Sequence, residues 1–118
     1  MRQVLMVDDD PGQLRIREII LRNAGIVSIL ATDAASAMAC LRSKDGEIGV
    51  LVTDHNLPGG SGAELVREAR LIAPSLPVMV LTGMPGIEPE YDGVEVTFCF
   101  KPLPPEEFIG AVQRLLSP

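Results

Sequence analysis

The sequence VLMVDDDP, residues 4–11, joins a short apolar segment to three acidic residues and a proline. Four consecutive apolar residues that include two valines are typical of a buried strand. Asp10 can cap a helix that begins at Pro11, because its carboxylate accepts hydrogen bonds from N–H groups that the first turn leaves unpaired, and proline suits the first helical position. The segment therefore predicts a strand, an acidic strand end and a helix in direct succession.

The same succession recurs along the rest of the chain. Apolar segments predict four more strands, at residues 26–30, 49–53, 77–81 and 94–100. The spacing of apolar residues predicts helices at residues 11–24, 33–42 and 61–72, and from residue 106 onward. Alternating strands and helices predict one α/β domain with a parallel five-stranded sheet covered on both faces. With right-handed crossovers, we expect the doubly wound strand order 2-1-3-4-5.

The crossover between the fourth and fifth strands has a different composition. Residues 83–93 read GMPGIEPEYDG, with two prolines and three glycines. Because both residue types disfavour a helix interior, we expect the fourth helix of this (βα)5 fold to be short, irregular or absent.

Composition limits the class of protein. The length of 118 residues suits a single domain, which we place at residues 1–118. A net charge of -6 argues against a nucleic-acid-binding surface, and no apolar run is long enough for a membrane span or a secretion signal. Two cysteines, Cys40 and Cys99, are too few for a disulfide framework. We therefore expect free thiols and a cytoplasmic protein.

Polar side chains follow the carboxyl ends of the predicted strands. Asp8 and Asp9 follow the first strand, Asp54 the third, Thr82 the fourth and Lys101 the fifth. Strands one and three are neighbours in the expected order, at the point where open α/β sheets bind ligands. The three carboxylates would therefore converge, and a hard cation such as Mg²⁺ would relieve their repulsion. Lysine and hydroxyl groups beside such a site suit a phosphoryl group.

Four ordered segments carry a resemblance to a known family: residues 4–11, 52–62 (VTDHNLPGGSG), 77–83 and 98–103 (FCFKPL). Together they resemble the receiver domain of two-component response regulators, and the match covers the whole chain. The resemblance implies a flavodoxin-like fold. It also implies that the protein accepts a phosphoryl group from a histidine kinase or a histidine phosphotransfer protein and then changes an output surface.

The resemblance assigns a role to each acidic residue. Asp54 would be the phosphoacceptor. Asp9, Asp54 and the backbone carbonyl of Asn56 would ligate Mg²⁺ or Mn²⁺, and Asp8 would act mainly through a metal-bound water. A receiver of this kind is not an enzyme acting on other molecules, since it promotes only its own phosphorylation and dephosphorylation.

The resemblance also implies roles for residues on the fourth and fifth strands. Lys101 would pair with the phosphoryl group, and Thr82 would bond to it and draw its loop inward. A cis Lys101–Pro102 peptide bond is implied as well. Phe98 lies where the family carries an aromatic rotamer switch, although a core phenylalanine is an equally good interpretation.

The residues that follow Asp54 and Thr82 in the chain also have candidate roles. Asn56 and Met84 lie two residues after Asp54 and Thr82, where family members tune the lifetime of the phosphoryl group. A thioether cannot position an attacking water, so we expect modest self-hydrolysis at most. His55 is a candidate general base, but we expect it to face solvent, because the chemistry needs no extra base.

Other functions stay open. Asp8 and Asp10 superficially match the Asp-x-Asp start of a Mg²⁺-dependent phosphohydrolase, but Gly12 stands where that family has Thr or Val. A degenerate receiver that only binds proteins is a further alternative. The irregular fourth helix makes the family's usual dimer surface doubtful. The output partner and kinase are not identifiable, and the chain is either a stand-alone receiver or part of a larger regulator or hybrid kinase.

Overall fold

The computed structural model describes residues 2–43 and 47–117, and its central feature is a parallel sheet of five strands. Their order is β2-β1-β3-β6-β7, which is the expected 2-1-3-4-5 order when only the strands of this sheet are counted. The five strands are β1 (Gln3–Val7), β2 (Ser28–Ala31), β3 (Ile48–Asp54), β6 (Val78–Thr82) and β7 (Thr97–Phe100). Two further short strands, β4 (Asn56–Leu57) and β5 (Gly60–Ser61), form an antiparallel hairpin after β3.

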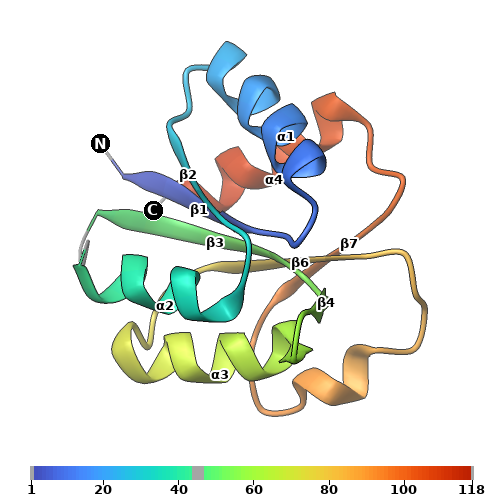
Figure 1. Ribbon diagram of the computed structural model, residues 1–118. Helices are drawn as coiled ribbons and strands as arrows, with labels where there is room; N and C mark the ends of the chain where they lie inside the picture. The colour runs from blue at the N-terminus through green and yellow to red at the C-terminus, as the bar shows by residue number, and fades with distance from the viewer. Residues whose placement is uncertain (1, 44–46, 118) are drawn as a thin grey trace.

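Helices cover both faces of the sheet. They are α1 (Pro11–Asn23), α2 (Ala34–Ser43), α3 (Gly62–Ile72) and α4 (Pro105–Leu116). Helices α1 and α4 pack on one face and α2 and α3 on the other (Figure 1). Two separate apolar cores result, one on each side of the sheet, and β1 and β3 contribute to both because their side chains alternate between the faces.

The helix starts follow the predicted caps. The Asp10 carboxylate accepts hydrogen bonds from the N–H groups of Gly12 and Gln13, at 2.9 and 3.3 Å. The Ser61 hydroxyl accepts a bond from the Glu64 N–H at 3.3 Å. These local bonds set the points at which α1 and α3 leave the ends of the preceding strand and hairpin, and so they fix the loops that carry the polar residues.

Two strands were predicted to begin two or more residues too early. The second strand begins at Ser28 instead of residue 26, because the Ile26 N–H closes the end of α1 by bonding to the Leu21 carbonyl at 2.9 Å. The fifth strand begins at Thr97 instead of residue 94. There, Arg70 of α3 binds the Glu95 carbonyl at 2.6 Å and holds the preceding segment outside the sheet.

The fourth crossover contains no α-helix. A four-residue 3-10 helix, η1 (Glu88–Tyr91), takes its place, so the strict alternation of a (βα)5 fold is broken here. The prolines and glycines of residues 83–93 account for this, because neither residue type supports a regular helix. None of the helices in the described residues is long and apolar enough to cross a membrane.

Candidate functional site

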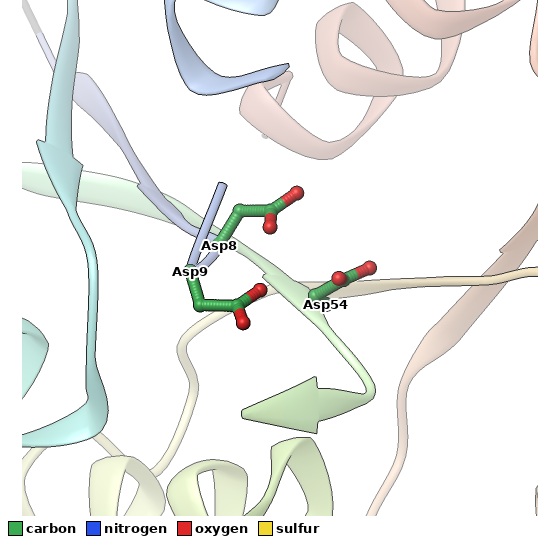
Figure 2. Close-up of side chains that lie close together, drawn as sticks. All are labelled: Asp8, Asp9 and Asp54. Carbon is green, nitrogen blue, oxygen red and sulfur yellow. The ribbon is translucent and has the colours of Figure 1, made fainter. Parts of the chain in front are cut away.

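Three carboxylates meet at the carboxyl ends of β1 and β3. Parallel pairing places Val7 beside Thr53, so Asp8 and Asp9 leave β1 next to Asp54 at the end of β3. One carboxylate oxygen from each residue lies within 4.8 Å of the others. Figure 2 shows the three side chains extending to the same side of the two strand ends. The predicted acidic cluster is therefore present.

The donor set fits a hard divalent cation. Two oxygens bound to one Mg²⁺ lie at most about 4.2 Å apart, twice the usual Mg–O distance of about 2.1 Å. The three carboxylates are already close to that separation, and carboxylate oxygens are the ligands that Mg²⁺ prefers. Small side-chain shifts would let the three carboxylates hold one ion, either directly or through a metal-bound water.

Arg17 is a member of the site that the sequence analysis missed. Its Nη1 lies 2.8 Å from Asp8 Oδ2, while the N–H of Asp10 donates to the other oxygen of Asp8 at 3.0 Å. Both partners are largely buried, with 14% of the Arg17 side chain and 3% of the Asp8 side chain exposed. The signal was available: Arg17 shares the spacing of Leu14 and Leu21, the buried stripe of α1.

Asp54 pairs with Lys101 from the end of β7. The Lys101 Nζ lies 2.6 Å from Asp54 Oδ1, and only 14% of the Asp54 side chain is exposed. Burial raises the pKa of the Asp54 carboxyl above its ordinary value; the hydrogen bond from Lys101 opposes this shift, and the charge of Asp8 adds to it. A cation at the cluster would favour the charged form of Asp54. The peptide bond between Lys101 and Pro102 is cis, as implied by the resemblance.

Thr82 ends β6 and its hydroxyl is occupied within its own turn. The hydroxyl oxygen accepts a bond from the Met84 N–H at 2.9 Å, and the hydroxyl donates to the Met84 carbonyl at 3.3 Å. The Asn56 amide donates to the Met84 sulfur at 3.5 Å. Asn56 and Met84, which both follow key positions in the chain, therefore contact one another above the strand ends.

His55 was predicted to face solvent, and this was wrong. Its side chain is buried, with a relative exposure of 5%. The Nδ1 atom lies 2.8 Å from the Tyr91 hydroxyl, and Nε2 lies 3.3 Å from a Glu90 carboxylate oxygen. The 3-10 helix η1 folds over this side chain. Burial of His55 could not be predicted from local patterns, because its partners lie more than thirty residues away in the chain.

Phe98 lies beside the same cluster. Its ring meets the Tyr91 ring edge-on, with centroids 5.2 Å apart, and it is partly buried. The two cysteines, Cys40 and Cys99, are both free.

A family model and several known proteins match most of this chain in sequence. The family model described as response regulator receiver domain matches residues 4–113. The C4-dicarboxylate transport transcriptional regulatory protein DctD of Pseudomonas aeruginosa is 32% identical over 118 residues, covering 98% of this chain and 25% of that protein. The probable transcriptional regulatory protein TcrX of Mycobacterium tuberculosis is 32% identical over 116 residues, covering 96% and 49%. The chain thus spans a quarter to a half of these relatives.

Solved structures match over almost the full chain. The chemotaxis protein CheY4 of Vibrio cholerae superposes with a TM-score of 0.87 at 28% identity, covering 98% of each chain. The receiver domain of the hybrid histidine kinase CckA superposes with a TM-score of 0.84 at 27% identity, covering 98% of this chain and 99% of that one.

Proposed function

The chain belongs to the response regulator receiver domain family of two-component systems, and from this membership and the geometry of the site we propose that Asp54 is its phosphoacceptor. One observation carries the assignment. Asp54 is the member of the acidic cluster that also pairs with Lys101, so a phosphoryl group attached there would lie between the carboxylates and a lysine. Asp8, by contrast, is engaged by Arg17 and a backbone N–H.

Phosphoryl transfer to Asp54 breaks one bond to phosphorus and forms another. An Asp54 carboxylate oxygen bonds to phosphorus as the P–N bond of a phosphohistidine donor breaks, and the electron pair stays on the donor nitrogen. The product is an acyl phosphate. The Lys101 ammonium group then shares its hydrogen bonds between Asp54 and a phosphoryl oxygen, and its positive charge stabilises the added negative charge.

A divalent ion completes this site. We propose that Asp9, Asp54 and the backbone carbonyl of Asn56 ligate Mg²⁺ or Mn²⁺, with Asp8 acting through a metal-bound water. When bound, the ion neutralises the carboxylates and the phosphoryl oxygens. Because Arg17 and Asp10 hold both oxygens of Asp8, direct ligation by Asp8 would require it to give up a bond.

Phosphorylation would be converted to a surface change through Thr82. The Thr82 hydroxyl would leave the Met84 backbone and bond to a phosphoryl oxygen, drawing the start of the fourth crossover toward Asp54. Asn56 and Met84 would set access of water to the acyl phosphate, and Phe98 would respond to the moved loop. The output surface on this side would be built from η1, β7 and α4.

The proposed domain comprises residues 1–118, and its phosphoryl donor is a histidine kinase or a histidine phosphotransfer protein. The output partner is proposed to be a further domain or a separate protein. Two free thiols suit a reducing compartment, which supports a cytoplasmic location.

The proposal is tested by finding which residue becomes phosphorylated. The protein is treated with phosphoramidate and Mg²⁺, the acyl phosphate is trapped by borohydride reduction, and the modified residue is located by peptide mass spectrometry. We expect modification at Asp54 and none in Asp54→Asn. Modification at Asp8 would instead indicate the phosphohydrolase, and a protein that binds no Mg²⁺ and shows no modification at Asp54 would indicate a binding module.

A further inference from the structure

The buried side chain of His55 ties the end of β3 to the fourth crossover. His55, the residue after Asp54, contacts η1 through both ring nitrogens: Nδ1 with the Tyr91 hydroxyl at 2.8 Å and Nε2 with Glu90 at 3.3 Å. His55 and Tyr91 are both buried, at 5% and 3% relative exposure. The tie therefore lies inside the protein, directly beside the proposed phosphoacceptor.

One neutral tautomer satisfies both contacts. With its proton on Nε2, the neutral imidazole accepts from the Tyr91 hydroxyl at Nδ1 and keeps Nε2 3.3 Å from a Glu90 carboxylate oxygen. Burial raises the pKa of the Tyr91 hydroxyl, so it stays protonated and able to donate. One hydrogen bond and one polar contact therefore connect the end of β3 to η1, and they fix the relative positions of the two elements more closely than apolar contact alone.

The backbone nearby leaves room for this tie. A Cβ atom at Gly62 would lie 2.7 Å from both the Tyr91 hydroxyl and the Asp54 carbonyl. Only glycine lets the phenol approach the end of β3 this closely. On its other side, the Tyr91 ring meets the Phe98 ring edge-on. Tyr91 therefore lies between His55 and β7.

Chain connectivity gives the tie a mechanical consequence. Five residues, 83–87, separate Thr82 from η1. If Thr82 moves toward a phosphoryl group, the start of this short segment moves with it, while the contacts of His55 with η1 hold the end of the segment in place. The tie then decides whether η1 follows the loop as a unit or is left behind.

We propose that His55 is a positioning residue that couples the state of Asp54 to η1 and, through Tyr91, to Phe98. The inference rests on the proposed function, because it needs an adduct at Asp54. Without the tie, Thr82 still reaches the phosphoryl group, but its movement is taken up within residues 83–87 and does not reach η1.

The chain carries its own reporter for this coupling. Tyr91 is the only tyrosine and there is no tryptophan, so intrinsic ultraviolet fluorescence comes from the phenol of the tie. Mg²⁺ with beryllofluoride serves as the phosphoryl mimic. In the unaltered protein we expect the mimic to change the tyrosine emission.

Two nearly isosteric variants separate the hydrogen bond from packing. His55→Asn keeps an acceptor close to the position of Nδ1, whereas His55→Leu fills similar space without one. We expect His55→Leu to lose most of the fluorescence change while keeping the Mg²⁺ affinity measured by calorimetry. His55→Asn should recover the change. Equal responses in the two variants would overturn the proposal.

A second variant keeps the test decisive if His55→Leu fails to fold. Tyr91→Phe retains the ring against Phe98 and removes only the hydroxyl. Amide hydrogen exchange of residues 88–94 replaces fluorescence as the readout, and the mimic-induced change in protection should be lost. An unchanged exchange response overturns the tie alone. Failure of the unaltered protein to form any adduct instead overturns the proposed function, and the tie with it.

Discussion

On the α1 side of Asp54, the buried carboxylate of Asp8 is held by two separate partners, whereas Thr82 and Lys101, on the other side, have partners that they can exchange. Asp8 is bonded both to the Asp10 N–H and to Arg17 of α1. Within residues 2–43 and 47–117 the Thr82 hydroxyl bonds only to the Met84 backbone, and Lys101 pairs with Asp54 while 35% of its side chain stays exposed. The first side is organised before any ligand arrives, and the second can exchange its partners.

The two sides of Asp54 also differ in the positive charge that each one contributes. The three carboxylates are opposed by two cations, Arg17 and Lys101, which leaves a net charge of about -1 at the strand ends. The arginine cannot lose its proton and is largely buried, so its charge is permanent. The lysine is more exposed and can turn toward a new anion. A divalent ion and a phosphoryl group would therefore meet one fixed and one movable cation.

The largest effect is expected from removing the movable cation. Lys101→Met should weaken binding of beryllofluoride in the presence of Mg²⁺ by about 10- to 100-fold, since hydrogen bonds to charged groups contribute about 1.5–3 kcal/mol. Fluorine NMR titration measures this affinity. The affinity for Mg²⁺ alone should rise or stay constant, because a positive charge is removed. A variant that binds the mimic as tightly as the unaltered protein would contradict the role of Lys101.

Close packing beside the tie predicts the next effect. Gly62→Ala would place a methyl group 2.7 Å from a backbone carbonyl, and the resulting shift should lower the free energy of unfolding by about 1–3 kcal/mol. Urea denaturation gives this value. Gly60→Ala is the matched control, because its Cβ would meet only the end of the Glu64 side chain, at 3.3 Å. Equal losses in both variants would show that the close approach of Tyr91 is unimportant.

Sequence patterns could predict what depends on local order and topology. The sheet order, the Asp10 and Ser61 caps and the meeting of three carboxylates all follow from segments read one at a time and then placed by crossover rules. The same reasoning could place Asp54 and Lys101 at one edge of the sheet. It needed no knowledge of side-chain packing.

Long-range side-chain pairs could not be predicted in this way. His55 was expected in solvent because the chemistry needs no extra base. Its partner, Tyr91, comes from a crossover whose path no periodicity describes, so no pattern indicated the contact. Arg17 was overlooked although its place on the buried stripe of α1 indicates a partner. The late start of β7 has a similar cause, since Arg70 of α3 takes a carbonyl from the segment before it.

The fixed cation should control metal affinity. Arg17→Met frees Asp8 and removes a positive charge, so the affinity for Mg²⁺ should rise, by about tenfold at most because solvent weakens the interaction. Isothermal titration calorimetry measures it. Arg15→Met is the matched control: it removes the same charge two residues earlier on α1, where Arg15 makes an exposed pair with Glu18. If both variants change Mg²⁺ affinity equally, the effect is general charge and not the bond to Asp8.

The smallest effect concerns pH. Because burial raises the pKa of Asp54, the folded protein binds a proton there more readily than the unfolded chain does. The free energy of unfolding should therefore fall as pH rises through the interval above the ordinary pKa of 3.8. Asp54→Asn should remove this slope and stabilise the metal-free protein at neutral pH, because the neutral amide avoids the cost of burying a charged carboxylate. Urea denaturation from acid to neutral pH measures both.

Asp33 offers a comparison of opposite sign. Hydrogen bonds from the backbone and side chain of Ser36 lower the pKa of its carboxyl, so its contribution to stability is present above the ordinary pKa and is lost as pH falls. Asp33→Asn should therefore lower stability at neutral pH, whereas Asp54→Asn raises it.

Saturating Mg²⁺ should cancel the stability gain of Asp54→Asn and should leave the effect of Asp33→Asn unchanged. The ion stabilises the folded protein only where the carboxylate can bind it. A gain that persists in Mg²⁺ would mean that Asp54 is not a metal ligand, and the acidic cluster would then have to hold its ion through Asp8 and Asp9.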